Sequence, residues 1–304
     1  MRTRGQSVSL KAFHVRKNWA ELTRRMEEDR RTIWRVVFGI VALSAIMTLI
    51  IQRLPLSMAL ESTIIEAISF CLFYAVVTWY ALRFKKEAKW VVLGIYIWVL
   101  LSAVLFNYLT KAGLPGPLHG NQRVYSPTLY FSTLLMLNWI ALGWVIHRYP
   151  REVKAVGLDL SRPELKVLYG LLAGGMVGGH FIFTASFSKM LSFSLKPLPY
   201  LTWQLFYELG LRSLGQELFF RGLVFNYLYR ARQWGFWAAA LLASLLNLSI
   251  YLGVWGRGNP VITAGMLFYI FIMAVINAAL YRWSDSIISP VVSSTVFHML
   301  IVLR

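Results

Sequence analysis

Long apolar runs separated by short polar loops dominate the hydrophobic pattern of this chain. Most runs are about 20 residues long, which is the length that an α-helix needs to cross the hydrocarbon core of a bilayer. Nine candidate spans follow this pattern: 33–51, 62–82, 90–109, 128–147, 167–187, 200–229, 235–254, 261–281 and 286–303. The pattern therefore predicts an all-α fold, a polytopic transmembrane helical bundle of about eight or nine spans.

Loop composition divides the predicted bundle into parts. Residues 1–31 contain nine Lys or Arg residues and form a predicted basic cytoplasmic arm that touches anionic lipid. The loop from Arg148 to Pro163 separates a four-span N-terminal module, 32–150, from a five-span membrane domain, 151–304. A Gly- and Pro-rich outside loop contains His119, which we interpret as a solvated loop residue.

The distribution of basic residues predicts the orientation of the spans. With the N-terminus inside, the inside segments carry 21 Lys or Arg residues and the outside segments carry seven. Positive charge accumulates on the cytoplasmic side of membrane proteins, so this bias predicts a cytoplasmic N-terminus.

Composition agrees with a membrane protein. Of the 304 residues, 58% are hydrophobic and only 14% are charged, too few polar residues to cover a soluble globule of this size. The net charge of +18 does not indicate nucleic-acid binding, because the basic residues are spread over short loops without a nucleic-acid motif. The single cysteine, Cys71, excludes an internal disulfide and is interpreted as a small core residue.

The sixth run is unusual because it carries charges in an apolar helix. Glu217 and Arg221 are four residues apart and share a helix face. An ionisable side chain at membrane depth needs a partner, so these two residues are predicted to pair. Glu208 and Arg212 repeat the spacing and are predicted to satisfy each other in the outer part of the same helix. Neighbouring helices are therefore expected to shield this stretch.

Glycines and isolated polar residues mark other spans. His180 follows a small-residue face and is interpreted as a packed histidine with a backbone partner, the alternative being a residue that lines the same cavity as Glu217. Glu66, in the second span, is interpreted as an interhelical hydrogen-bond residue. Small residues at helical spacing let two helices approach closely. They lie at Gly170, Gly174, Gly175, Gly178 and Gly179.

Residues from about Gly157 to the C-terminus resemble the CPBP family, the Abi or CAAX-protease-and-bacteriocin-processing group of intramembrane proteases. The resemblance rests on Glu-Leu-Phe-Phe-Arg-Gly at 217–222, Gly-Leu-Asp-Leu at 157–160, and the closing run from Ser289 to His298. The family blocks read Glu-Glu-x-x-x-Arg, Phe-x-x-x-His and His-x-x-x-Asn. The resemblance implies a Glu that activates water with a His, and a second His and an Asn that stabilise the oxyanion. It also implies an Arg that holds the geometry, supported by the second Glu.

This chain departs from the family at most of these positions. Gln216 replaces the first Glu, and an amide cannot act as a general base near neutral pH. In the second block Asn247 takes the place of the Phe and Tyr251 that of the His, with the register left open by one turn. The third block keeps His298, but Val302 replaces the Asn and cannot donate to an oxyanion.

Glu217, Arg221 and His298 are the retained motif positions, and they are not sufficient for the family's catalysis. Glu217 lies about 100° round the helix from Gln216 and so points elsewhere. The sequence therefore predicts a catalytically inactive family member, a pseudoprotease in the membrane. It would bind a membrane protein partner or a hydrophobic or lipidated peptide, as a binding or assembly subunit surrounded by lipid.

Two alternatives stay open: an active intramembrane endopeptidase of the CAAX-protease type, and a transporter or permease subunit. No cofactor or metal is predicted, because Glu217, His298 and His180 are the few intramembrane side chains available as ligands. The resemblance and the charge bias together favour a bacterial inner membrane. Four serines on apolar helices are interpreted as small packing residues: Ser213, Ser244, Ser293 and Ser294.

Overall fold

The computed structural model describes six ranges of the chain and a few single residues. These are 26–51, 157–159, 161–188, 193–196, 198–251 and 260–302, with Ala20, Thr23, Arg24, Phe73, Ile97 and His147. The predicted spans at 62–82, 90–109 and 128–147 lie outside the described residues, apart from one residue in each. Glu66, Cys71 and His119 also lie outside them, so the interpretations of these residues stay predictions.

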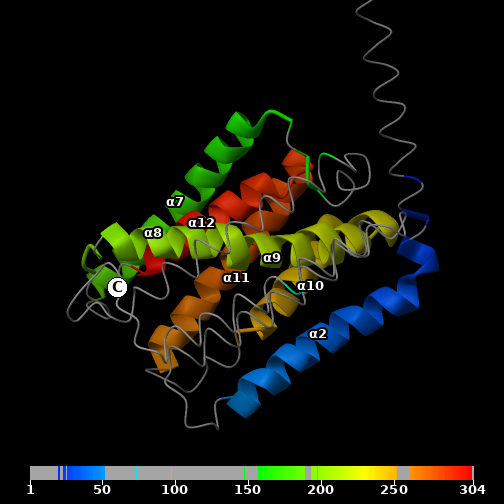
Figure 1. Ribbon diagram of the computed structural model, residues 1–304, viewed down its shortest axis with the longest axis horizontal. Helices are drawn as coiled ribbons and strands as arrows, with labels where there is room; N and C mark the ends of the chain where they lie inside the picture. The colour runs from blue at the N-terminus through cyan, green and yellow to red at the C-terminus, as the bar shows by residue number, and fades with distance from the viewer. Residues whose placement is uncertain are drawn as a thin grey trace, which may run out of the picture.

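The described chain is all-helical, without a strand in these ranges, and the all-α prediction is confirmed for this part (Figure 1). A long helix consists of five consecutive segments, two α-helical and three π-helical. The elements are α2 (Arg30–Ile51), α7 (Pro163–Phe187), α8 (Leu198–Tyr207), η1 (Glu208–Arg212), α9 (Ser213–Glu217), η2 (Leu218–Phe225), η3 (Tyr227–Ala231), α10 (Phe236–Ser249), α11 (Pro260–Ser284) and α12 (Ile288–Val302).

Two of the described helices, α7 and α11, are long and apolar enough to cross a membrane. Helices α10 and α12 are apolar but shorter. The prediction of eight or nine spans is therefore not confirmed and stays a prediction.

The long helix, from α8 to η3, runs through the middle of the C-terminal bundle (Figure 1). Every side chain from Ser213 to Leu228 is buried, which confirms that neighbouring helices shield this stretch. The helix continues without a break through Gly210 and Gly215. Gly210 lies in a π-helical turn, whose hydrogen bonds run from residue i+5 to residue i and so keep the backbone groups paired.

Helices α7 and α12 lie side by side because three glycines of α7 face α12 (Figure 1). A Cβ added at Gly170 would lie 2.7 Å from the carbonyl oxygen of Ser289, and one at Gly178 would lie 2.6 Å from Leu300 Cδ1. Gly174 is closer still to the α12 backbone, at the carbonyl oxygen of Ser293. The predicted close helix approach is confirmed for these three glycines.

The segment 157–159 ties the start of α7 to the turn between α11 and α12. The carbonyl of Gly157 accepts a hydrogen bond of 2.8 Å from the backbone N–H of Ile287. The carbonyl of Asp159 accepts bonds from Lys166 Nζ at 2.8 Å and from Ser286 Oγ at 3.0 Å. Gly157 has a φ of 90°, which glycine adopts without strain. The Gly-Leu-Asp-Leu lead-in therefore has a structural role in this bundle.

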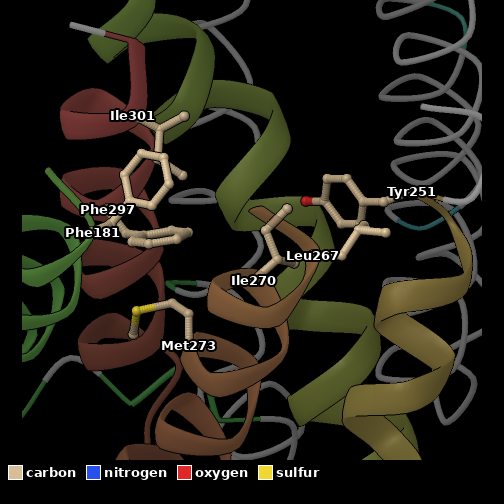
Figure 2. Close-up of a cluster of buried hydrophobic side chains, with 7 residues drawn as sticks. All are labelled: Phe181, Tyr251, Leu267, Ile270, Met273, Phe297 and Ile301. Atoms are coloured by element: carbon tan, nitrogen blue, oxygen red, sulfur yellow. The ribbon is translucent and has the colours of Figure 1, made fainter. Parts of the chain in front are cut away.

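A buried cluster joins α7, α11 and α12 to Tyr251, which follows α10 (Figure 2). Figure 2 shows the hydroxyl of Tyr251 pointing from the α10 end toward the long helix. The apolar packing therefore presents one polar group to the centre of the bundle. The cluster consists of Phe181, Tyr251, Leu267, Ile270, Met273, Phe297 and Ile301.

We expect Gly174→Ala to destabilise the protein, because the new methyl group would push against the backbone of α12. Overpacking of this kind costs about 1–3 kcal/mol. Gly175→Ala is the matched control on the same helix, since no described atom lies within 4 Å of its Cβ position. It should be neutral or stabilise by up to about 1 kcal/mol through helix propensity. Thermal unfolding in detergent compares the two, and equal midpoints would contradict the assigned helix face.

Candidate functional site

Glu217 and Arg221 form a fully buried ion pair, as the sequence predicts. The side chains are 1% and 0% exposed, and Arg221 Nε lies 3.1 Å from Glu217 Oε2. This contact lacks hydrogen-bond geometry, so its attraction is that of two charges at close range. The guanidinium also donates a hydrogen bond of 2.7 Å from Nη2 to the carbonyl of Ala274 on α11.

The other oxygen of Glu217 is held by two further helices. Asn277 Nδ2, on α11, donates to Glu217 Oε1 at 2.8 Å, and Ser294 Oγ, on α12, donates to the same atom at 2.7 Å. Asn277 Nδ2 also donates to Ser294 Oγ at 2.7 Å. Sequence analysis missed Asn277 and treated Ser294 as a packing residue. Both are hydrogen-bond donors that fix α11 and α12 against the long helix.

Gln216 and Tyr251 form a second polar pair, buried between the long helix and the end of α10. Gln216 Nε2 donates to the Tyr251 hydroxyl at 2.9 Å, and the hydroxyl donates back to Gln216 Oε1 at 3.1 Å. The structure thus brings together the two positions where the resemblance implies a water-activating Glu and its His. Asn247, one turn earlier, is buried, and its Oδ1 accepts no hydrogen bond within the described part of the chain.

Glu208 is the centre of a third polar cluster, which the sequence did not predict. Its carboxylate is fully buried. Oε1 accepts hydrogen bonds from Gln204 Nε2 at 3.0 Å and from Arg212 Nη1 at 3.1 Å. Oε2 accepts one from Ser213 Oγ at 2.9 Å and lies 2.9 Å from His298 Nδ1.

This cluster changes the interpretation of Glu208 and shows the partner of His298. The Glu208–Arg212 contact is confirmed, but the carboxylate lies inside the bundle instead of being satisfied by Arg212 alone. His298 Nδ1 lies 2.9 Å from Glu208 Oε2, and no hydrogen bond or ion pair joins His298 to Glu217 among the described residues. The π-helical turn of η1 contributes, because the backbone N–H of Ser213 bonds to the carbonyl of Glu208 and brings the Ser213 hydroxyl to the carboxylate.

Arg212 connects the Glu208 cluster to the Gln216–Tyr251 pair. Its Nη2 lies 3.4 Å from the Tyr251 hydroxyl, and its guanidinium carbon lies 5.5 Å from the centre of the Tyr251 ring. Glu208, Gln216, Tyr251 and His298 therefore belong to one connected polar network. A second Glu-x-x-x-Arg spacing on the same helix was the only sequence signal for it.

Two candidate positions lie apart from this network. His180 is exposed on α7, and its Nδ1 lies 2.7 Å from the Tyr269 hydroxyl and 3.5 Å from Thr184 Oγ1. Its partners are thus side chains on a surface, neither the predicted backbone group nor Glu217. Val302 ends α12, but its side chain lies outside what the structure describes, so its role stays a prediction.

Comparison with known proteins identifies the class of this bundle. Residues 198–301 match the family model of the type II CAAX prenyl endopeptidase Rce1-like proteins. The match covers about one third of the chain, from α8 to α12, and includes all three polar clusters. It confirms the predicted family resemblance for this segment. No curated protein and no solved structure matches the chain.

We expect Arg221→Leu to cost about 3–5 kcal/mol, because it leaves the Glu217 carboxylate buried without its counter-charge. Arg24→Leu is the control: it removes an i,i+4 partner of Glu28 whose side chains are 64% and 56% exposed. An exposed pair of this kind contributes about 0–1 kcal/mol. Reversible unfolding in mixed detergent micelles would measure both losses of stability. Similar losses for the two variants would show that the buried pair contributes no more to the free energy of unfolding than the exposed pair.

Proposed function

We propose that this protein is a catalytically inactive relative of the CAAX endopeptidases that serves in the membrane as a binding or assembly subunit. The observation that supports this proposal is the Gln216–Tyr251 pair. The two side chains occupy the positions where the resemblance implies a Glu and a His that activate water. Here both polar atoms of the amide are engaged with one phenol.

The chemistry of this pair supports a loss of proteolysis. General-base catalysis needs a group that takes a proton from water, and neither an amide nor a protonated phenol does so near neutral pH. The retained residues Glu217 and Arg221 neutralise each other and are bonded to α11 and α12. These contacts have a structural role, since they hold the long helix against α11 and α12.

The surface of α7 supports a role in binding within a membrane. Met176, Phe183 and Phe187 are 74%, 67% and 80% exposed. Large apolar side chains gathered on one surface suit contact with lipid or with another apolar protein. The ligand that we propose is a membrane protein partner or a hydrophobic or lipidated peptide. A bacterial inner membrane and a cytoplasmic N-terminus belong to the same proposal.

A cleavage assay tests the proposal directly. We expect no cleavage of a library of hydrophobic and prenylated peptides by the purified protein in lipid, while an active CAAX endopeptidase in the same assay provides the positive control. Gln216→Glu should fold and still not cleave, because it returns one carboxylate without the His that the resemblance implies at Tyr251. Cleavage by the wild-type protein, or by this single variant, would overturn the pseudoprotease proposal.

The same preparation tests the binding role. Isolation from native membranes should recover a stoichiometric membrane partner or bound peptide, and its recovery should fall when Tyr251→Ala opens the Gln216–Tyr251 pair. Ser293→Ala is the matched control, since within the described ranges the Ser293 hydroxyl donates a hydrogen bond only to Met273 Sδ, at 3.7 Å, and lies outside the polar network. A protein that is isolated without any stoichiometric companion would contradict an assembly role.

A further inference from the structure

The groups around Glu208 determine which side chain is the donor in the Glu208–His298 hydrogen bond. Glu208 pairs with Arg212, so its carboxylate is ionised and can only accept hydrogen bonds. Gln204 and Ser213 are donors to the same carboxylate. His298 Nδ1, at 2.9 Å, must therefore carry a proton and donate it to Oε2.

When His298 donates a hydrogen bond from Nδ1, its second ring nitrogen, Nε2, can interact with another group. In the neutral imidazole, a proton on Nδ1 makes Nε2 a hydrogen-bond acceptor. Glu208 accounts for every side-chain hydrogen bond of His298 within the part of the chain that the structure describes, so Nε2 has no partner there. A carboxylate bonded to one imidazole nitrogen fixes the ring orientation.

Hydrogen bonds relate this acceptor to the Gln216–Tyr251 pair, where the resemblance implies the active site. Arg212 joins the Glu208 cluster to Tyr251, which in turn holds Gln216. The side chain of His298 is 8% exposed, so the ring is mostly withdrawn from solvent. In apolar surroundings, a peptide N–H without an acceptor costs several kcal/mol, so an accessible imidazole nitrogen would be a strong recognition element.

We propose that Glu208 and His298 form a carboxylate–imidazole dyad whose Nε2 accepts a hydrogen bond from a backbone N–H of the bound hydrophobic peptide. This inference rests on the proposed binding function and assigns a role to Glu208, which no family motif covers. It also reverses the role that the resemblance implies for His298, from a donor to an oxyanion to an acceptor. Glu208 is a positioning residue, since it acts through the ring.

The tautomer of His298 tests the dyad without any ligand. The probe is nitrogen-15 magnetic resonance of the full-length protein, labelled at histidine and embedded in lipid, with the His298 signals assigned by their loss in His298→Asn. We expect the wild-type ring to be neutral and protonated on Nδ1. Glu208→Gln should change this state, because the amide can donate to Nδ1 and move the proton to Nε2. Ser213→Ala is the control, since it keeps the carboxylate and should leave the tautomer unchanged.

The accessibility of Nε2 is tested with diethyl pyrocarbonate, a small electrophile that acylates unprotonated imidazole nitrogen. Peptide mass spectrometry of the treated protein should show His298 modified, at a rate that falls several-fold in Glu208→Gln. His180 is the internal standard, because it is exposed and distant from Glu208 in its contacts, and its rate should not change. Circular dichroism of both variants checks that the fold is retained.

The outcomes distinguish a failure of the proposed dyad from a failure of the proposed function. A His298 protonated on Nε2, or one that never reacts with diethyl pyrocarbonate, overturns the dyad and leaves the pseudoprotease proposal standing. A reactive Nδ1-protonated His298 supports the dyad. If the protein also cleaved peptides, and lost cleavage in Glu208→Gln, the dyad would survive as a general base and the proposed function would fall.

Discussion

Charged side chains buried in an apolar bundle constrain everything that surrounds them. Removing a carboxylate and a guanidinium from water costs several kcal/mol for each ion, and only close partners offset this cost. Glu217 and Arg221 meet that requirement with each other and with groups from α11 and α12. The positions of both helices relative to the long helix are therefore fixed by polar contacts, while the glycine face of α7 then brings α7 against α12.

The π-helical turns explain how one helix presents two carboxylates to the same neighbour. Glu208 and Glu217 are nine residues apart, which in a regular α-helix is about two and a half turns and places them on opposite faces. Their partners on α12, His298 and Ser294, are four residues apart and share one face. The η1 segment, Glu208–Arg212, changes the helical phase between the two carboxylates and so reduces the mismatch.

This change in helical phase explains which contacts the sequence predicts correctly and which it does not. The close approach at Gly174 and the Glu217–Arg221 pair follow from regular α-helical spacing, and the structure confirms both. The Glu208–His298 contact depends on a π turn, and regular spacing predicts the wrong face for it. Asn277 could not be found either, because one amide on an apolar helix carries no local signal for the partner that it meets across the bundle.

The Gln216–Tyr251 pair and the neighbouring Glu208 cluster differ in whether the buried polar groups carry charge. Gln216 and Tyr251 are joined by buried hydrogen bonds between an amide and a phenol. An amide and a phenol need no counter-charge, so this pair carries none of the desolvation cost of an ion. Glu208 keeps its charge, and four donors surround it. The Glu208 carboxylate thus lies where donors from the long helix and from α12 converge on it, and it holds the His298 imidazole about two turns before Gln216 on the long helix.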